Sequence, residues 1–152
     1  MGLSKDLIDF INLLKKNDVA FAICGGHAVG FHGYPRATLD LDILLLPNEE
    51  NAKKIIFTLH EFGFGNCGIP LEAFLKEKTA ITLGEQPNQI DLLTSMSLDS
   101  TKDILSRSIE GALESISVLY VGREDLIRAK KEAARPKDLA DLDELRKFSN
   151  YQ

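Results

Sequence analysis

One stretch decides the fold: Gly25-Gly26-His27-Ala28-Val29-Gly30-Phe31-His32-Gly33-Tyr34-Pro35-Arg36-Ala37-Thr38-Leu39-Asp40-Leu41-Asp42-Ile43. The apolar run 19–24 stops at its two glycines, and a second apolar run, 41–46, has Asp40 and Asp42 at its beginning. Side chains two positions apart on a strand point the same way, so these two carboxylates would converge on one face. Two like charges held side by side require a cation between them.

Paired glycines suit a backbone that comes close to a ligand. Gly25 and Gly26 stand where a short helix is expected to begin, and the free N–H groups and positive dipole of a helix end attract an anion. Glycines for a phosphate and carboxylates for a divalent cation together predict a site for a metal ion and a nucleoside triphosphate.

This stretch resembles the signature of the nucleotidyltransferase superfamily, which includes DNA polymerase beta. That signature is a glycine pair, a spacer and Asp-x-Asp between apolar residues; the spacer here runs over 27–39. The segment 36–42 is similar to the Arg-x-Thr-x-Asp-x-Asp of small bacterial members: the minimal nucleotidyltransferases, the lincosamide-type antibiotic nucleotidyltransferases and the AbiEii-type toxins. His27 departs from the many members that carry Ser or a bulky residue there. An Asp-x-Asp without the glycines also occurs in sugar-nucleotide glycosyltransferases.

The resemblance implies a third acid on a neighbouring strand, and Asp91 in Gln89-Ile90-Asp91-Leu92-Leu93 fits that place. A buried, unpaired Asp in an apolar strand is costly, and the alternative is a surface Asp at the strand's end. The resemblance further implies that Asp40 and Asp42 hold two Mg²⁺ ions. Asp91 would bind the ion that activates the nucleophile and would accept its proton. Gly25 and Gly26 would cradle the β and γ phosphates.

A basic segment, 122–137, stands out in an otherwise acidic chain. It is similar to the Leu-Ile-x-x-Lys…Arg-x-Lys-Asp-x-x-Asp pattern that follows the third acid in the small bacterial nucleotidyltransferases. On a functional interpretation, Lys130, Arg135 and Lys137 neutralise the triphosphate opposite the metal. On a structural interpretation, the segment is a solvated helix face with weak ion pairs. The sequence favours neither.

Three further charged residues have open roles. Arg36 is a candidate nucleotide-binding residue that would orient Asp42 or a phosphate, or would pair locally. Asp138 and Asp141 are expected to be structural, either capping the last helix or pairing with Arg135.

The whole chain bounds these interpretations. Its 152 residues suggest one domain, 1–152, and its net charge of −5 argues against broad nucleic-acid binding through bulk charge. No apolar signal core begins the chain, and no apolar run approaches membrane-spanning length.

Cys24 and Cys67 are interpreted as reduced, partly buried thiols of a cytoplasmic protein rather than as a disulfide. Zinc binding by these thiols with His27, His32 and His60 is disfavoured, because no repeated Cys/His spacing is present.

Hydrophobic periodicity and breaking residues predict an α/β (α+β) domain: a small mixed sheet flanked by helices and closed by a C-terminal helix pair. The region 70–76 is ambiguous, and Leu139, Leu142 and Leu145 are expected to face inward. The expected strands are 19–23, 41–46, 79–83, 89–93 and 118–121, with a hairpin turn at 84–88. The expected helices are 4–16, 26–31, 49–62, 100–109, one from 122 to about 133, and one beginning at Pro136.

We interpret the chain as a metal-dependent nucleotidyltransferase that moves an NMP from an NTP such as ATP to an acceptor hydroxyl, with release of pyrophosphate. The alternative is a non-catalytic binding module with the same fold, such as a toxin–antitoxin partner. The sequence leaves open the acceptor (an antibiotic, a tRNA or a protein), the choice of NTP, and whether the chain forms a homodimer or binds a protein partner.

Overall fold

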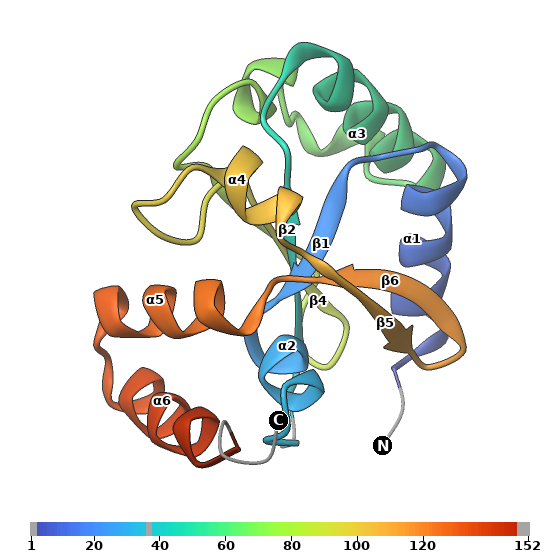
Figure 1. The fold of residues 1–152 in the computed structure, drawn as a ribbon. Coiled ribbons are helices and arrows are strands. Elements are labelled where there is room, and N and C mark those ends of the chain that lie inside the picture. Colours follow the sequence, from blue (N-terminus) through green and yellow to red (C-terminus); the bar gives the residue numbers. More distant parts are fainter. Residues whose placement is uncertain (1–2, 36–37, 149–152) are drawn as a thin grey trace.

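The computed structural model describes residues 3–35 and 38–148. A six-stranded mixed sheet runs through the molecule in the order β3-β4-β2-β1-β6-β5 (Figure 1). The central strands are β1 (Phe21–Cys24) and β2 (Asp40–Leu45), which are antiparallel to each other. On one side β4 (Gln89–Leu93) lies parallel to β2 and forms a hairpin with β3 (Ala80–Leu83). On the other side β6 (Ile116–Tyr120) lies parallel to β1 and forms a hairpin with β5 (Ile109–Leu113).

Helices gather at the two ends of the sheet. In Figure 1, α1 (Lys5–Lys16) and α3 (Glu49–Phe62) lie together at one end, and α2 (Gly25–Phe31), α5 (Arg123–Ala133) and α6 (Pro136–Phe148) lie at the other. The remaining elements are α4 (Thr101–Ser106) and two short 3₁₀ segments, Gly65–Cys67 and Leu71–Phe74. No helix within the described ranges is long and apolar enough to cross a membrane.

The two helices at the first end are set by their caps. The Ser4 hydroxyl accepts a hydrogen bond from the Leu7 N–H at the start of α1, and the Asn48 side chain does the same for Asn51 in α3. Gly63 ends α3 in the left-handed conformation, with a φ of 102°. These ends agree with the sequence prediction, because each cap is a local signal.

The core lies around β2. Leu41, Ile43, Leu44 and Leu45 have no exposed surface, so this strand is covered on both faces, as its continuous apolar run predicted. Only the acids at its start interrupt the apolar run. The strand therefore fixes the place of those acids as firmly as it fixes the core.

Register brings chemistry-bearing residues into one row across the sheet. Asp42 pairs with Cys24 of β1 on one side and with Asp91 of β4 on the other, and Asp91 pairs with Thr82 of β3. Directly paired residues place their side chains on the same face of a sheet. Asp40, two residues before Asp42, shares that face.

Several sequence predictions of local structure are corrected. The helix predicted over 100–109 ends at Ser106, and Ile109 begins the edge strand β5, which was not predicted. That strand contains Glu110, Gly111 and Ala112, which are poor strand formers, and it exists through its pairing with β6. The first strand begins at Phe21 rather than at residue 19. The ambiguous region 70–76 contains the 3₁₀ segment Leu71–Phe74.

Two burial predictions are wrong. Leu139 of α6 is 50% exposed, whereas Leu142 and Leu145 are buried as predicted. Both cysteines are free, but Cys67 is exposed and Cys24 alone is buried.

Candidate active site

A cleft of about 430 Å³ opens over the carboxyl end of β1. One wall carries the acids of β2 and β4: Asp40, Asp42 and Asp91. Gly25 and Gly26, at the start of α2, lie beside them. The opposite wall comes from α5 and from the first turn of α6. It contributes apolar residues, among them Leu126 and Ala129, and the charged residues Lys130, Arg135, Lys137 and Asp138.

Asp42 and Asp91 are in direct contact. Burial, followed by a side-chain hydrogen bond with Asp91 and the negative charges of Asp91 and Asp40, raises the pKa of Asp42 from 3.8 to about 7. The raised pKa means that Asp42 holds its proton more tightly than an ordinary aspartate in the ligand-free protein, because burial and the nearby carboxylates disfavour its charged form.

Gly25 is required at its position by geometry. It has a φ of +66°, and a Cβ built there would collide with the carboxylate of Asp42. Residues with a side chain rarely adopt such a φ. The backbone at Gly25 thus lies directly against the carboxylate of Asp42.

Neutral donors hold two of the acids. The Thr82 hydroxyl donates to Asp91 Oδ1 over 2.7 Å, and Gln89 Nε2 donates to both carboxylate oxygens of Asp91 over 3.2 Å. Gln86 Nε2, from the turn between β3 and β4, donates to Asp40 Oδ1 over 3.0 Å.

Sequence reasoning missed these donors. Gln89 carried a signal, since it lies two residues before Asp91 and so shares its face of the strand. Thr82 could have been found from the hairpin register alone. Gln86 reaches Asp40 only through the conformation of the turn, for which the sequence offers no local signal.

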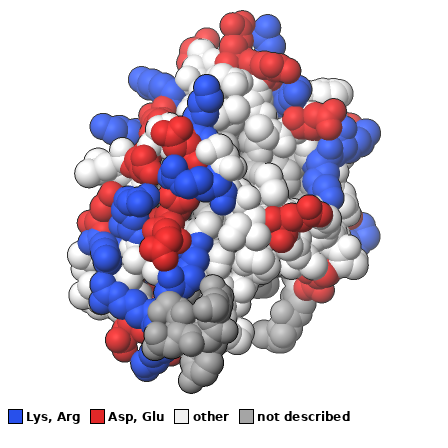
Figure 2. Space-filling view, viewed as in Figure 1, with Lys and Arg blue, Asp and Glu red and all other residues white. Residues whose placement is uncertain are grey.

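The predicted cations of the basic segment are in the cleft wall, but two of them are already paired. Lys130 Nζ lies 3.1 Å from Asp141 Oδ2 and 3.4 Å from Asp138 Oδ1. Arg135 Nε lies 2.6 Å from Asp138 Oδ2, so the predicted pairing of Arg135 with Asp138 is confirmed. Hydrogen bonds from Arg135 hold the pKa of Asp138 below its ordinary value although burial acts to raise it. Figure 2 shows acidic and basic side chains interleaved over the side where α4 and α5 lie, not a uniform basic surface.

Lys137 differs from these two cations. It is exposed and lines the cleft, and its positive charge acts to lower the pKa of Asp42. Arg36, the remaining predicted nucleotide-binding residue, lies outside the described residues. The structure thus brings together the two glycines, the three acids and the three described cations of the sequence prediction.

Metal binding needs a separate test of fit. Within residues 3–35 and 38–148, no three His, Cys, Asp or Glu side chains form a ready-made cluster for a metal ion. Asp40, engaged by Gln86, does not join the Asp42–Asp91 pair in such a cluster. No described Lys or Arg forms an ion pair with Asp40, Asp42 or Asp91, so their charge is left for a ligand to neutralise. Buried His32 has its Nε2 2.8 Å from the carbonyl oxygen of Val121.

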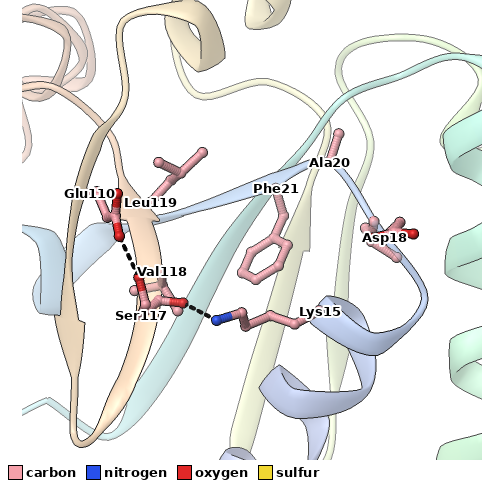
Figure 3. Close-up of a pocket in the computed structure, with 9 residues that line it drawn as sticks. Lys15, Asp18, Ala20, Phe21, Glu110, Ser117, Val118 and Leu119 are labelled. Atoms are coloured by element: carbon pink, nitrogen blue, oxygen red, sulfur yellow. Dashed lines mark hydrogen bonds between the residues drawn. The ribbon is translucent and has the colours of Figure 1, made fainter.

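A second cavity, of about 390 Å³, lies at the opposite end of β1, beside Phe21 (Figure 3). Its polar rim is engaged internally: Lys15 Nζ donates to the carbonyl of Ser117, and the Ser117 hydroxyl donates to Glu110. The described residues that line it include no glycine, and its two acids, Asp18 and Glu110, lie on opposite sides of the cavity (Figure 3). The cleft at Asp42 is therefore the better candidate for chemistry.

Comparison with known proteins supports the fold assignment. No family model and no curated protein sequence matches the chain. The solved structure of the lincosamide antibiotic adenylyltransferase LnuA, with lincomycin bound, superposes with a TM-score of 0.57 at 11% identity, covering 97% of this chain and 99% of that chain. An antigenic nucleotidyltransferase-like protein from Paracoccidioides brasiliensis gives a TM-score of 0.49 at 14% identity, covering 95% and 78%. The resemblance read from the sequence is confirmed at the level of architecture: the chain has the nucleotidyltransferase fold.

Proposed function

We propose that this chain is a metal-dependent nucleotidyltransferase, which moves an NMP from an NTP to an acceptor hydroxyl and releases pyrophosphate. The observation that carries the proposal is the contact between Asp42 and Asp91 directly against the backbone of Gly25. A fold needs no such arrangement for its stability, because the contact places like charges together at a glycine that accepts no side chain. The nucleotidyltransferase fold supports the same conclusion.

The acids present fit Mg²⁺ as the ion. The donor set consists of carboxylate oxygens alone, which suits a hard divalent cation. No described Lys or Arg forms an ion pair with Asp40, Asp42 or Asp91, so an ion would supply the positive charge that these carboxylates lack at close range. Ion binding would also require Asp42 to release its proton. We propose two ions, with Asp40, Asp42 and Asp91 as their ligands.

The proposed roles follow from where each group lies. When bound, Mg²⁺ supplies charge neutralisation of the triphosphate and activation of the acceptor hydroxyl. Asp91, held by Thr82 and Gln89, is oriented to accept the proton of that hydroxyl. Gly25 and Gly26 leave room for the β and γ phosphates to approach the backbone. Lys137, exposed at the facing wall, neutralises phosphate charge.

We further propose that residues 1–152 act as a single domain, since the described strands form one sheet around one core. The acceptor stays open among an antibiotic, a tRNA and a protein. LnuA acts on a lincosamide antibiotic, and that activity belongs to LnuA.

The second candidate function is a non-catalytic binding module of a toxin–antitoxin type. One observation favours it: among the described residues no three ligating side chains are preassembled for a metal. The two candidates differ in a simple assay. The protein is incubated with Mg²⁺, each α-³²P-labelled NTP and three acceptor pools, which are aminoglycoside and lincosamide antibiotics, total tRNA, and cell protein.

A nucleotidyltransferase transfers label to one of these pools, and the Asp91→Asn variant transfers none. Transfer that persists undiminished in Asp91→Asn would assign the activity to a contaminant. A protein that binds no NTP and labels no pool would be the binding module.

A further inference from the structure

Four charged residues form a network between α5 and α6, and three of them, Lys130, Asp138 and Asp141, are buried, whereas the side chain of Arg135 is 63% exposed. Lys130 comes from the last turn of α5, and its side chain is 9% exposed; its partners Asp138 and Asp141, from α6, are 1% and 5% exposed. Arg135 joins them from the turn between the helices. Its guanidinium donates to both oxygens of Asp138, over 2.6 Å and 3.2 Å, and its backbone N–H donates to the same carboxylate over 3.2 Å.

The described ion pairs of this network link two cations with two carboxylates. Burying a charge is costly unless it is paired, so the buried members Lys130, Asp138 and Asp141 depend on their partners. Removing Lys130 alone would leave Asp141 in a buried place without its nearest cation. Removing Lys130 and the charge of Asp141 together would leave the Arg135–Asp138 pair balanced.

The network also fixes the path of the chain. Ala134 ends α5 in the left-handed conformation, with a φ of 51°, and α6 begins at Pro136. Lys137 therefore lies between the turn and Asp138. Asp138 accepts hydrogen bonds from Lys130 Nζ and Arg135 Nε. Because these contacts fix Asp138, the backbone on both sides of Lys137 is held against α5.

The cations of the cleft thus differ in availability. Lys130 has its ammonium group between two carboxylates and is nearly buried, whereas Lys137 is exposed at the cleft and close enough to Asp42 to influence its ionisation. A phosphate would have to compete with Asp138 and Asp141 for Lys130. It meets no such competition in the described contacts of Lys137.

We propose that Lys130 is a positioning residue: it clamps α6 to α5 through Asp141 and Asp138, and so holds Lys137 where the triphosphate binds. Lys130 itself does not contact phosphate. This inference rests on the proposed function, and it chooses between the two interpretations of the basic segment for each lysine separately.

A double-mutant cycle tests the clamp. The variants are Lys130→Met, Asp141→Asn and the double variant, with Lys137→Met as the contact variant and Lys131→Met, an exposed neighbour on α5, as the matched control. Calorimetry measures the affinity for ATP with Mg²⁺ and for adenosine, and thermal scans without ligand measure the melting temperature.

The clamp predicts a characteristic pattern. Lys137→Met weakens ATP binding about tenfold, the value of one charge-assisted contact, and leaves adenosine binding and melting unchanged. Lys130→Met and Asp141→Asn each weaken ATP binding and lower the melting temperature. The double variant recovers to within about threefold of the parent affinity, because the pair has been removed as a unit. Lys131→Met behaves as the parent.

A direct phosphate contact by Lys130 predicts different results. Asp141→Asn would then free the lysine and keep or strengthen ATP binding, and the double variant would stay as weak as Lys130→Met; either result overturns the inference. If the parent binds no ATP with Mg²⁺, the proposed function fails, and the ligand-free scans still decide the clamp. Melting losses that simply add in the double variant would overturn it, whereas recovery would support it.

Discussion

Asp42 and Asp91 are register partners on the parallel strands β2 and β4, and their carboxyl groups are hydrogen-bonded to each other. The backbone pairing forces this contact, since neighbouring strands place paired side chains within reach of each other. The ligand-free site is therefore strained by charge and relieved by a proton.

The Asp42→Asn variant should be at least as stable as the parent without metal at pH 8. The amide removes one of the opposed charges and can donate a hydrogen bond to Asp91. Thermal scans in chelator should show an equal or higher melting temperature. Scans with Mg²⁺ and ATP should show a rise for the parent and a much smaller rise for the variant. A variant that melts earlier by the same amount in both buffers would mean that Asp42 is a structural residue.

The stability of the metal-free protein should fall as the pH rises from about 4 to about 7. The raised pKa of Asp42 means that the folded protein keeps a proton in a range where the unfolded chain, with a pKa of 3.8, has lost it. The free energy of unfolding decreases wherever the folded state binds more protons, by about 1.4 kcal/mol per pH unit at most for one group. Above pH 7 this contribution is constant.

Asp138, whose pKa is lowered, contributes in the opposite direction, but only at lower pH, between its lowered pKa and the ordinary value of 3.8. The comparison with Asp42→Asn isolates Asp42. Urea unfolding in chelator, repeated at several pH values, should give a difference between parent and variant that grows up to pH 7 and then stays level. A difference that is independent of pH would contradict the raised pKa of Asp42.

Replacing Gly25 by alanine should damage both the fold and the site, whereas the same change at Gly30 should be tolerated. At Gly25 an L-residue must adopt a φ of +66°, at a cost of about 1–2 kcal/mol, and its methyl group would displace Asp42. At Gly30, inside α2, the nearest atom to a new Cβ is Pro35 Cα at 3.7 Å, an ordinary contact. Gly30→Ala should therefore be neutral or stabilising by about 0.5–1 kcal/mol.

Thermal scans and ATP binding check both glycine variants. Gly25→Ala should melt earlier and lose ATP binding. If both variants behave alike, the close approach of Gly25 to Asp42 is not the reason that a glycine is needed at position 25.

Asp125 should be a main structural acid of the α4–α5 region. It is 3% exposed and accepts hydrogen bonds from Arg107 over 2.7 Å and from Arg128 over 3.0 Å. Both arginines are about half exposed, so Asp125→Ala should cost about 2 kcal/mol, less than a fully buried pair would. Asp143→Ala is the control. The Asp143 side chain is 74% exposed, and its Oδ2 lies 3.8 Å from Lys147 Nζ. Its loss should lower the free energy of unfolding by less than about 0.5 kcal/mol, as is typical of exposed ion pairs. Equal urea midpoints for the two variants would contradict this assignment.

The parts of the fold that were predictable are those with local signals. Asn48 and Gly63 mark the ends of α3, and the apolar run after Asp42 marks a strand buried on both faces. The edge strand β5 had no such signal. It contains Gly111, a poor strand former, and the reason for a glycine there is the ring of Phe31, a residue far away in sequence that would collide with a Cβ.

The same division holds in the site. The spacing of Gly25, Asp40 and Asp42 indicated that these residues meet, since adjacent elements carry them. The ion pair between Lys130 and Asp141 was not predicted, although the two residues lie on consecutive helices, α5 and α6. Its cause is the tight turn at Ala134, and a turn of that kind at a non-glycine residue has no distinctive sequence pattern.

Above all, we propose that the acids of β2 and β4 and the glycines of α2 form one site for a metal ion and a nucleoside triphosphate. Isothermal calorimetry of ATP binding, with Mg²⁺ and again with chelator, tests it most directly when it is run on the parent and on Asp42→Asn. A shared site predicts that the parent binds ATP only with Mg²⁺ and that the variant binds at least about tenfold more weakly under the same conditions. Equal ATP affinity in Mg²⁺ and in chelator, or an unchanged affinity in Asp42→Asn, would contradict it.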